Sequence, residues 1–108
     1  AMKNETKLHN KIIAWLEKHG FVAVKMPGTV FMRGLPDILA IRNGRVWFFE
    51  VKTSKGKLSL LQKVWLEKLA KFGARCSVVR SVEEVIEIVA SFADEHASFE
   101  THPIRGME

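Results

Sequence analysis

Apolar residues recur along this chain at two spacings, one typical of helices and one of strands, and their order predicts the architecture. Within residues 4–19, Leu8, Ile12 and Leu16 repeat at helical spacing, and Asn4 is expected to cap the helix. Short apolar runs, separated by glycine, proline and asparagine, then predict three consecutive strands, at residues 21–26, 37–41 and 45–53.

A second helix and a fourth strand are expected to follow. Ser59 and Gln62 have the spacing of a capping box at the start of this helix. Its buried stripe is expected to consist of Leu61, Val64, Trp65, Leu69 and Phe72. The run 75–80, which contains Cys76, then predicts a buried strand.

A third helix is predicted near the C-terminus. Ser81 and Glu84 have the spacing of a second capping box, and the helix is expected to run to about Glu95. Its apolar repeat consists of Val82, Val85, Ile86, Val89 and Ala93. Periodicity is absent from His96 onward, so the tail, residues 96–108, is expected to be loose or to be used in a contact.

The predicted order is helix, three strands, helix, strand, helix, which gives an α/β fold of the αβββαβα type. The first three strands have short connections and should form an antiparallel meander, with a tight hairpin at Asn43-Gly44. The fourth strand follows a crossover helix and should pair in parallel. We therefore expect a mixed four-stranded sheet flanked by helices, with the apolar third strand in its centre. No linker divides the chain, so residues 1–108 are expected to form a single domain, with a folded core over about residues 4–95.

The composition agrees with a folded protein and points to a polyanionic partner. Hydrophobic residues make up 47% and charged residues 27%, which excludes disorder for most of the chain. The net charge of +5 hides an asymmetry, because residues 1–82 have a balance of +11 and residues 83–108 one of −6. A basic body favours nucleic acid, and the alternative interpretation is a lysine-rich surface that is simply solvated.

Membrane and secreted classes are disfavoured. No apolar run approaches the roughly 20 residues that span a bilayer. The first residues are polar and do not resemble a signal peptide, once Ala1 is set aside as a cloning remnant. The single cysteine, Cys76, makes neither an internal disulfide nor a thiolate metal cluster. We therefore expect a cytoplasmic protein without membrane contact.

The residues best suited to chemistry lie on either side of the predicted hairpin. Asp37 is six residues before Asn43 and Glu50 is six residues after Gly44, so the two carboxylates should lie nearly opposite each other. Two adjacent carboxylates repel unless a cation lies between them. Lys52 is two residues after Glu50 and points to the same face. A carboxylate pair with a lysine beside it suits a hard divalent cation.

Gly34-Leu35-Pro36-Asp37, followed by Glu50-Val51-Lys52 and then by Gln62, resembles the motifs of the PD-(D/E)xK nuclease superfamily, and within it the VRR-NUC family of virus-type replication and repair nucleases. The resemblance covers about residues 5–95 and implies a restriction-endonuclease-like core, in agreement with the predicted order of elements. The matching features are Gly34-Leu35-Pro36-Asp37, Glu50-Val51-Lys52, Lys55-Gly56-Lys57-Leu58-Ser59, Gln62 and Arg80-Ser81-Val82-Glu83-Glu84.

The resemblance implies a metal site and no small-molecule cofactor. The ligands would be Asp37, Glu50 and the backbone carbonyl of Val51, with Mg²⁺ as the expected ion and Mn²⁺ as its substitute. Glu5 would match the acid that the family carries on its first helix, which approaches a metal directly or through water and on which a second metal site depends, and Lys7 is the alternative residue for that position. Zinc is not expected, because the motifs contain no cysteine or histidine.

The resemblance also implies roles for two polar side chains. Lys52 would orient the attacking water or stabilise the charge that develops on the phosphate. Gln62 would point into the site, and its alternative role is the helix cap with Ser59. In the implied reaction, a water whose pKa the cation lowers attacks a phosphodiester in line.

Several further residues are candidates for contacts near this site. Five basic side chains could follow the phosphates of DNA, with a solvated basic rim as the alternative: Arg33, Arg42, Arg45, Lys55 and Lys57. His9 lies one helical turn beyond Glu5, and two interpretations are open: a histidine that borders the site or, as the favoured one, a plain helix-surface histidine.

The expected function is that of a Mg²⁺-dependent DNA endonuclease acting on branched DNA, such as a Holliday junction or a flap, in replication, repair or recombination. A homodimer with two active sites is expected by the same resemblance, and the family includes phage-encoded members that act in the host cell. Three alternatives remain, namely a nuclease that nicks plain duplex, a non-catalytic nucleic-acid-binding module and an enzyme that acts on RNA. The intact set of Asp37, Glu50 and Lys52 argues against the binding module.

Overall fold

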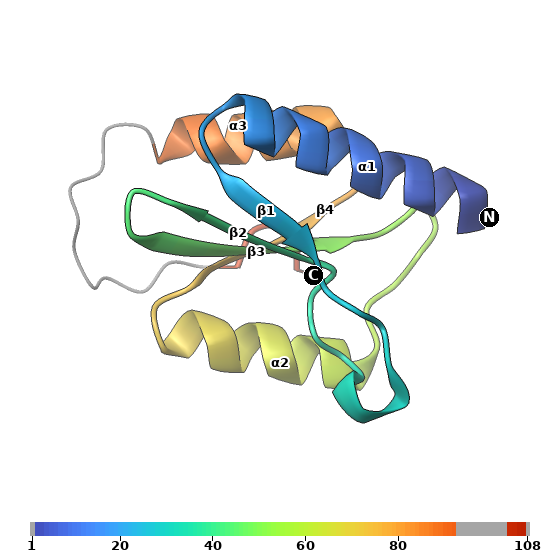
Figure 1. Ribbon diagram of the computed structural model, residues 1–108. Coiled ribbons are helices and arrows are strands. Elements are labelled where there is room, and N and C mark those ends of the chain that lie inside the picture. Colours follow the sequence, from blue (N-terminus) through green and yellow to red (C-terminus); the bar gives the residue numbers. More distant parts are fainter. Residues whose placement is uncertain (1, 93–103, 108) are drawn as a thin grey trace.

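The computed structural model (Figure 1) describes residues 2–92 and 104–107 of the chain. Its elements follow in the order α1 (Met2–Lys18), β1 (Val22–Lys25), the 3₁₀ helix η1 (Val30–Met32), β2 (Ile38–Arg42), β3 (Arg45–Val51), α2 (Leu60–Lys71), β4 (Arg75–Val79) and α3 (Val82–Ser91). This order confirms the predicted αβββαβα architecture, with η1 as an addition in the loop between β1 and β2.

The four strands form one mixed sheet in the order β1-β2-β3-β4. β2 pairs antiparallel with both β1 and β3, and β4 pairs in parallel with β3. Asn43 and Gly44 form the hairpin turn with φ angles of 52° and 74°, in the left-handed region that asparagine and glycine tolerate best. The apolar strand β3 lies between β2 and β4, so the prediction of a central third strand is confirmed.

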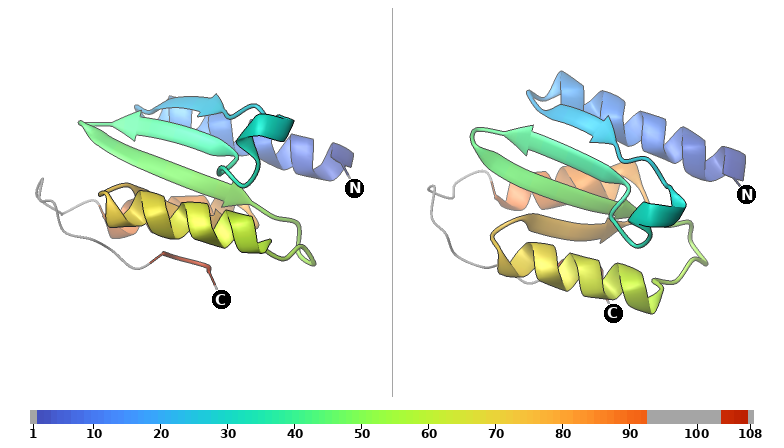
Figure 2. Two further views of the ribbon diagram at one scale, coloured as in Figure 1. Left: turned by 90° about the horizontal axis from the view of Figure 1, so that it is seen from below. Right: turned by 60° about the horizontal axis from the view of Figure 1, so that its bottom comes forward.

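Helices cover the two faces of the sheet unequally. α1 and α3 lie side by side on one face, and α2 lies on the other (Figure 1). Trp47, Phe49 and Val51 alternate along β3 and are buried in the same cluster as Ile12 and Leu16 of α1. α2 packs on β4, and in the described part of the chain no helix covers β1 and β2 on that face (Figure 2).

The uncovered part of this face is apolar. Val22 pairs with Ile41, Ile41 pairs with Val46, and these three cross-strand neighbours are exposed at 69%, 42% and 37%. Val24 and Leu39 pair two residues further along the strands and therefore lie on the same face. We call these five residues the open sheet face. Apolar surface of this kind on a small protein often contacts a partner.

α1 begins earlier than predicted. The helix starts at Met2, so Asn4 is an exposed residue of its first turn and not its N-cap. A side-chain cap contributes only about 1 kcal/mol. The residues before Asn4 are methionine and lysine, which are good helix formers and let the helix extend past it.

α2 turns a different side toward the sheet than the predicted stripe. Its buried residues are Leu66 and Ala70, whereas Leu61, Val64 and Phe72 are exposed at 44%, 49% and 80%. Apolar residues occur on more than one side of this helix, so their spacing does not select the buried side. The contact with β4 selects it, because Leu66 and Ala70 join a small cluster with apolar residues of that strand.

α3 also differs in detail from its prediction. It ends at Ser91, earlier than expected, and Ala93 and Glu95 lie outside the described residues. Ile88 is buried in place of Ile86, which is 38% exposed. The helix packs on both α1 and β4, so two neighbours determine which of its residues are buried. The apolar repeat in the sequence does not contain this information.

The second predicted capping box is only half formed. Ser81 Oγ accepts the backbone N–H of Glu84 at 3.2 Å, as expected of an N-cap. The Glu84 carboxylate, however, accepts the backbone N–H of Arg80 at 3.3 Å and not that of Ser81. Glu84 therefore reaches one residue beyond the cap, and it still provides an acceptor for an N–H group just before the helix.

Residues 104–107 return to the sheet at the outer edge of β4. The backbone N–H of Val78 donates to the carbonyl of Arg105 at 2.7 Å. Ile104 and Met107 pack against the cluster that lies between α2 and β4. The described part of the tail therefore makes a contact within its own chain, and residues 96–103 lie outside the described residues.

Cys76 is buried in β4, as predicted, and is a free thiol. Burial raises the pKa of its thiol to about 12, so the thiol stays protonated and unreactive at neutral pH. Among the described residues, no helix has the length and apolar character needed to cross a membrane.

Candidate active site

Asp37 and Glu50 lie opposite each other where β2 begins and β3 ends. Ile38 pairs with Phe49, and the same register carried one residue further brings Asp37 against Glu50. The backbone N–H of Val51 donates to Asp37 Oδ2 at 2.7 Å and fixes this carboxylate across the two strands. The predicted opposition of the two acids is confirmed. Because side chains alternate between the two faces of a strand, Asp37 and Glu50 belong to the same face of the sheet as the residues of the open sheet face.

One oxygen of the Glu50 carboxylate has polar partners, and the other has no hydrogen bond from a described residue. Its Oε2 lies 3.2 Å from Gln62 Nε2 and 3.6 Å from Lys52 Nζ. Its Oε1 is buried, and no described residue forms a hydrogen bond with it. Burial, and after it the adjacent Asp37 carboxylate, raise the pKa of Glu50 to about 8 against the opposing effect of Lys52. Without a further positive charge, this side chain is therefore largely protonated at neutral pH.

This geometry fits a divalent cation. A buried carboxylate oxygen without a partner, next to a second carboxylate, costs free energy unless positive charge meets it. Lys52 approaches Oε2 of Glu50, and Oε1 is left for another ligand. Carboxylate oxygens are the ligands that Mg²⁺ and Mn²⁺ prefer.

Lys52 is positioned by β4 and by the loop that follows β3. Its backbone N–H donates to the carbonyl of Val79 at 3.0 Å, and its side chain is 18% exposed. Gly56 packs against the aliphatic part of this side chain, because a Cβ at Gly56 would lie 3.4 Å from Lys52 Cδ. The loop thus restricts the lysine stem while the ammonium group reaches Glu50.

Gln62 combines the two roles that the sequence presented as alternatives. The side-chain Oε1 of Gln62 accepts the backbone N–H of Ser59 at 2.9 Å, and the backbone N–H of Gln62 donates to Ser59 Oγ at 3.1 Å. These two bonds confirm the capping box. The Nε2 of Gln62 donates to Glu50 Oε2 at the same time. The start of α2 is therefore linked directly to the carboxylate pair.

Two side chains of α1 approach the site from the other face of the sheet. One ligand atom each of Glu5, His9 and Asp37 lies within 4.8 Å of the others. Lys7, the alternative to Glu5, is exposed. His9 is 3% exposed, so the expectation of a helix-surface histidine is wrong. The signal in the sequence was its spacing of four residues from Glu5, which puts both side chains on one side of the helix.

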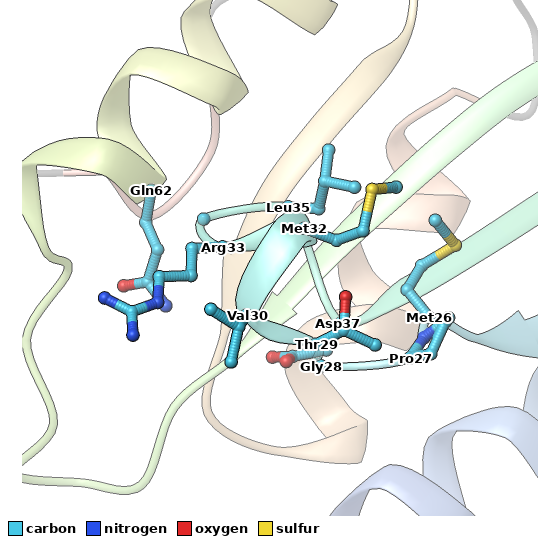
Figure 3. Close-up of a pocket in the computed structure, with 11 residues that line it drawn as sticks. Met26, Pro27, Gly28, Thr29, Val30, Met32, Arg33, Leu35, Asp37 and Gln62 are labelled. Carbon is cyan, nitrogen blue, oxygen red and sulfur yellow. The ribbon is translucent and has the colours of Figure 1, made fainter.

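The loop between β1 and β2 forms a pocket with the start of α2 (Figure 3). The pocket has a volume of about 380 Å³, and Asp37, Gln62 and Arg33 are among the residues that line it. Gly34 lets the loop approach α2, because a Cβ there would lie 2.6 Å from Leu61 Cγ. The pocket gives a ligand access to the Asp37 side of the site.

The candidate DNA contacts fall into two groups. Arg33, Lys55 and Lys57 are exposed on the loops that precede β2 and follow β3, at the carboxylate end of the strands. Arg42 and Arg45 lie at the hairpin turn, at the other end of the same strands. Arg42 also donates a hydrogen bond to the carbonyl of His19, just beyond the end of α1, at 3.0 Å. The structure therefore groups three of the five basic residues with the carboxylates.

A second pocket brings together basic residues that are distant in sequence. It has a volume of about 370 Å³ and is lined by Lys57, Lys63 and Arg80 together with Gly106. Arg80 also donates to the carbonyl of Thr53 in the loop after β3. Sequence reasoning missed Lys63 and Arg80 as companions of Lys57, because the three lie on different elements.

Comparisons with known proteins agree with this fold and identify the family. The family model for archaeal Holliday junction resolvase (Hjc) matches residues 4–83. A solved structure described as a VRR_NUC domain superposes with a TM-score of 0.71 at 28% identity, covering 82% of this chain and 96% of that one. This match confirms the resemblance to the VRR-NUC family.

Two further relatives are named for DNA junctions. The Holliday junction resolvase Hjc of the archaeal hyperthermophile Archaeoglobus fulgidus has a TM-score of 0.59 at 28% identity, covering 70% of this chain and 67% of that one. A crossover junction endodeoxyribonuclease of Sulfolobus islandicus rod-shaped virus 1 is 36% identical over 64 residues, which are 57% of this chain and 52% of the relative. The chain thus spans about half the length of that curated relative. Because the family model spans most of its residues, the chain belongs to the archaeal Holliday junction resolvase (Hjc) family.

Proposed function

We propose that this protein is a divalent-metal-dependent endonuclease that cleaves DNA at branched structures, with the four-way junction as its favoured substrate. The observation that carries the proposal is the facing pair of Asp37 and Glu50, with one buried oxygen of Glu50 unsatisfied and Lys52 beside the other. The names of the relatives support junction DNA as the substrate. Such an enzyme would act inside a cell.

The first cation site in this proposal consists of Asp37, Glu50 and the backbone carbonyl of Val51. Mg²⁺ would be its usual ion and Mn²⁺ its substitute, because the donors are all oxygens. A cation bound there would act as a Lewis acid that lowers the pKa of a water and offsets negative charge on the phosphate.

The protein's own side chains would orient the reaction. Lys52 would hold the attacking water or meet the charge that develops on the phosphate, because its ammonium group already lies beside Glu50. Gln62 would keep the Glu50 carboxylate in one orientation through its hydrogen bond to Oε2. Preorganised groups of this kind need little rearrangement when the substrate binds.

DNA would reach this site over a basic surface. Arg33, Lys55 and Lys57 lie on the loops at the carboxylate end of the strands, and Lys63 and Arg80 share a pocket with Lys57. Lysine and arginine contacts of this kind neutralise phosphates and position a duplex without reading its sequence.

We also propose that the enzyme acts as a homodimer, because two active sites are needed to cut two strands of a junction. The open sheet face supports an interface with a second copy, since Val22 is 69% exposed and its neighbours across the strands are also apolar. Light scattering should then give twice the chain mass of 12.3 kDa. A Val22→Asp, Ile41→Asp double variant should give a monomer that stays folded.

The decisive experiment compares labelled four-way junction, flap, single-stranded and plain duplex DNA, each with Mg²⁺, Mn²⁺ or EDTA. Wild type is tested beside Asp37→Ala and Lys52→Ala. The matched controls are Glu17→Ala, an exposed acid of α1, and Lys71→Ala at the far end of α2. We expect metal-dependent cutting of the junction that falls by about a hundredfold or more in the two site variants and persists in both controls.

Each outcome of this experiment separates the alternatives. Cutting of plain duplex as fast as of the junction would favour a nicking nuclease. Tight binding of DNA without cutting in either metal would favour a non-catalytic binding module. Cutting that survives Asp37→Ala would reject the proposed site.

A further inference from the structure

The His9 ring has a fixed orientation at the edge of the carboxylate pair. Its Nδ1 lies 2.7 Å from the backbone carbonyl oxygen of Glu5. A carbonyl oxygen can only accept, so Nδ1 is the nitrogen that carries the proton. In the neutral ring, Nε2 is therefore the nitrogen with the lone pair. A histidine that ligates a metal usually has this arrangement, with its second nitrogen donating to a backbone carbonyl or a carboxylate.

The lone-pair nitrogen faces a carboxylate. His9 Nε2 lies 3.5 Å from Asp37 Oδ2. His9 is 3% exposed, and Nε2 has no hydrogen-bond partner among the described residues. A buried lone pair that faces a carboxylate oxygen is repelled unless positive charge lies between the two. That charge is either a proton on Nε2 or a cation that both groups bind.

Glu5 supplies a third donor at the same place. It lies one turn before His9 on α1, and ligand atoms of Glu5, His9 and Asp37 lie within 4.8 Å of one another. Two donors that are each about 2.1 Å from one ion lie about 3 Å apart at right angles and about 4 Å apart across it. Small movements of these side chains would therefore bring all three donors to a single ion.

Glu5 and Asp37 are acids that the family resemblance already implies near the metal, and we propose that His9 Nε2 adds a nitrogen ligand to them, which makes this second cation site select a transition ion such as Mn²⁺ over Mg²⁺. The inference rests on the proposed function through Asp37, which the second cation site shares with the first. Mg²⁺ binds oxygen ligands and keeps much of its water, whereas the first-row transition ions accept imidazole. One nitrogen ligand is therefore enough to make the two sites differ in ion preference.

Binding of Mn²⁺ alone tests this inference without DNA and without cleavage. Electron paramagnetic resonance counts bound Mn²⁺ from the loss of the free-ion signal, and its pulsed form detects ¹⁴N coupling from a nitrogen ligand. The wild type should bind two Mn²⁺ per chain and show ¹⁴N coupling. His9→Gln should lose the coupling and weaken one of the two Mn²⁺ sites by about tenfold or more. Competition with Mg²⁺ should displace Mn²⁺ from the first cation site before the second.

The matched control is His19→Gln. His19 has the same local bond, from Nδ1 to the carbonyl of Trp15 four residues earlier at 2.8 Å, but it is exposed just beyond the end of α1. This variant should bind two Mn²⁺ and keep the ¹⁴N coupling. Glu5→Gln changes a half-buried position and removes a different ligand of the second cation site. It should also weaken one Mn²⁺ site, which provides an independent test if His9→Gln does not fold.

The outcomes distinguish this inference from the proposed function. Absence of ¹⁴N coupling in the wild type, or two unweakened Mn²⁺ sites in His9→Gln, would show that His9 only forms an ion pair with Asp37 and would overturn the second cation site. If in that case the Glu50→Gln variant binds one Mn²⁺ fewer than the wild type, the first cation site and the proposed function stand. If the wild type binds no Mn²⁺ at all, both are wrong.

Discussion

The side-chain amide of Gln62 donates to Glu50 Oε2 at 3.2 Å, which links the first turn of α2 to a buried carboxylate of β3. The oxygen of the same side-chain amide, Oε1, accepts the backbone N–H of Ser59 at 2.9 Å. One side chain therefore stabilises a helix and orients a candidate metal ligand. Substitutions can separate these two contributions.

Gln62→Glu is expected to keep the helix cap and to damage the site. Glutamate forms a capping box at this position as well as glutamine does, so the contribution of the cap to the free energy of unfolding should change by less than about 1 kcal/mol. The substitution replaces an amide donor by a carboxylate beside Glu50, so cleavage of a labelled junction should fall at least about tenfold.

Ser59→Ala is the matched control and should have the opposite effect. Loss of the N-cap hydroxyl should lower the free energy of unfolding by about 1 kcal/mol and leave the rate of cleavage near that of wild type. Urea unfolding and single-turnover cleavage measure the two quantities. An equal loss of cleavage in both variants would contradict a direct role of Gln62 in the site.

The metal-free protein is expected to lose stability as the pH rises from about 5 to about 8. Glu50 has a pKa of about 8 in the folded protein and its ordinary value of 4.5 in the unfolded chain. Between these values the folded state binds more protons, so its free energy of unfolding falls as the pH rises, by at most about 1.4 kcal/mol per pH unit. Urea unfolding in EDTA at stepped pH measures this slope.

Glu50→Gln removes the titrating group and should flatten that slope. Saturating Mn²⁺ should weaken the slope in the wild type, because a bound cation favours the charged carboxylate. A slope that is unchanged in Glu50→Gln would show that another group causes the pH dependence.

Gly106→Ala is expected to detach the C-terminal segment from β4. A Cβ at Gly106 would lie 2.2 Å from the carbonyl oxygen of Val78, and its φ is +78°. Gly44 has a similar φ of +74° but no atom within 4 Å of such a Cβ. Gly44→Ala therefore reports the backbone strain alone, which costs about 1–2 kcal/mol.

Hydrogen exchange distinguishes the two glycine variants. The N–H of Val78 donates to Arg105, so it should exchange faster in Gly106→Ala than in Gly44→Ala, measured relative to the global stability of each variant. Equal relative protection of this amide would contradict the proposed contact between Gly106 and Val78.

Lys57→Ala should weaken binding of junction DNA and reduce the dependence of affinity on salt. If Lys57 contacts one phosphate, the slope of log affinity against log salt should fall by about 1. Lys71→Ala, at the other end of α2, should leave the slope unchanged. Binding in EDTA at several salt concentrations measures both variants, and equal slopes for them would place Lys57 outside the interface.

The order of elements and the facing of Asp37 and Glu50 could be predicted from sequence because local rules determine them. A strand repeats every two residues, and Asn43-Gly44 tolerates the left-handed turn that sets the register. Once the turn is fixed, residues equally distant from it meet across the strands. The carboxylate pair is therefore a consequence of sequence spacing.

The buried side of α2 and the position of His9 were decided only by the tertiary structure. α2 carries apolar residues on more than one side, and the contact with β4 buries Leu66 and Ala70 while Phe72 stays exposed. The polar residues around His9 predict a surface position, but α1 packs on one face of the sheet and brings His9 to Asp37. Periodicity describes how residues repeat within one element. Which repeat is buried, and which side chains meet across elements, depends on packing between segments that are distant along the chain.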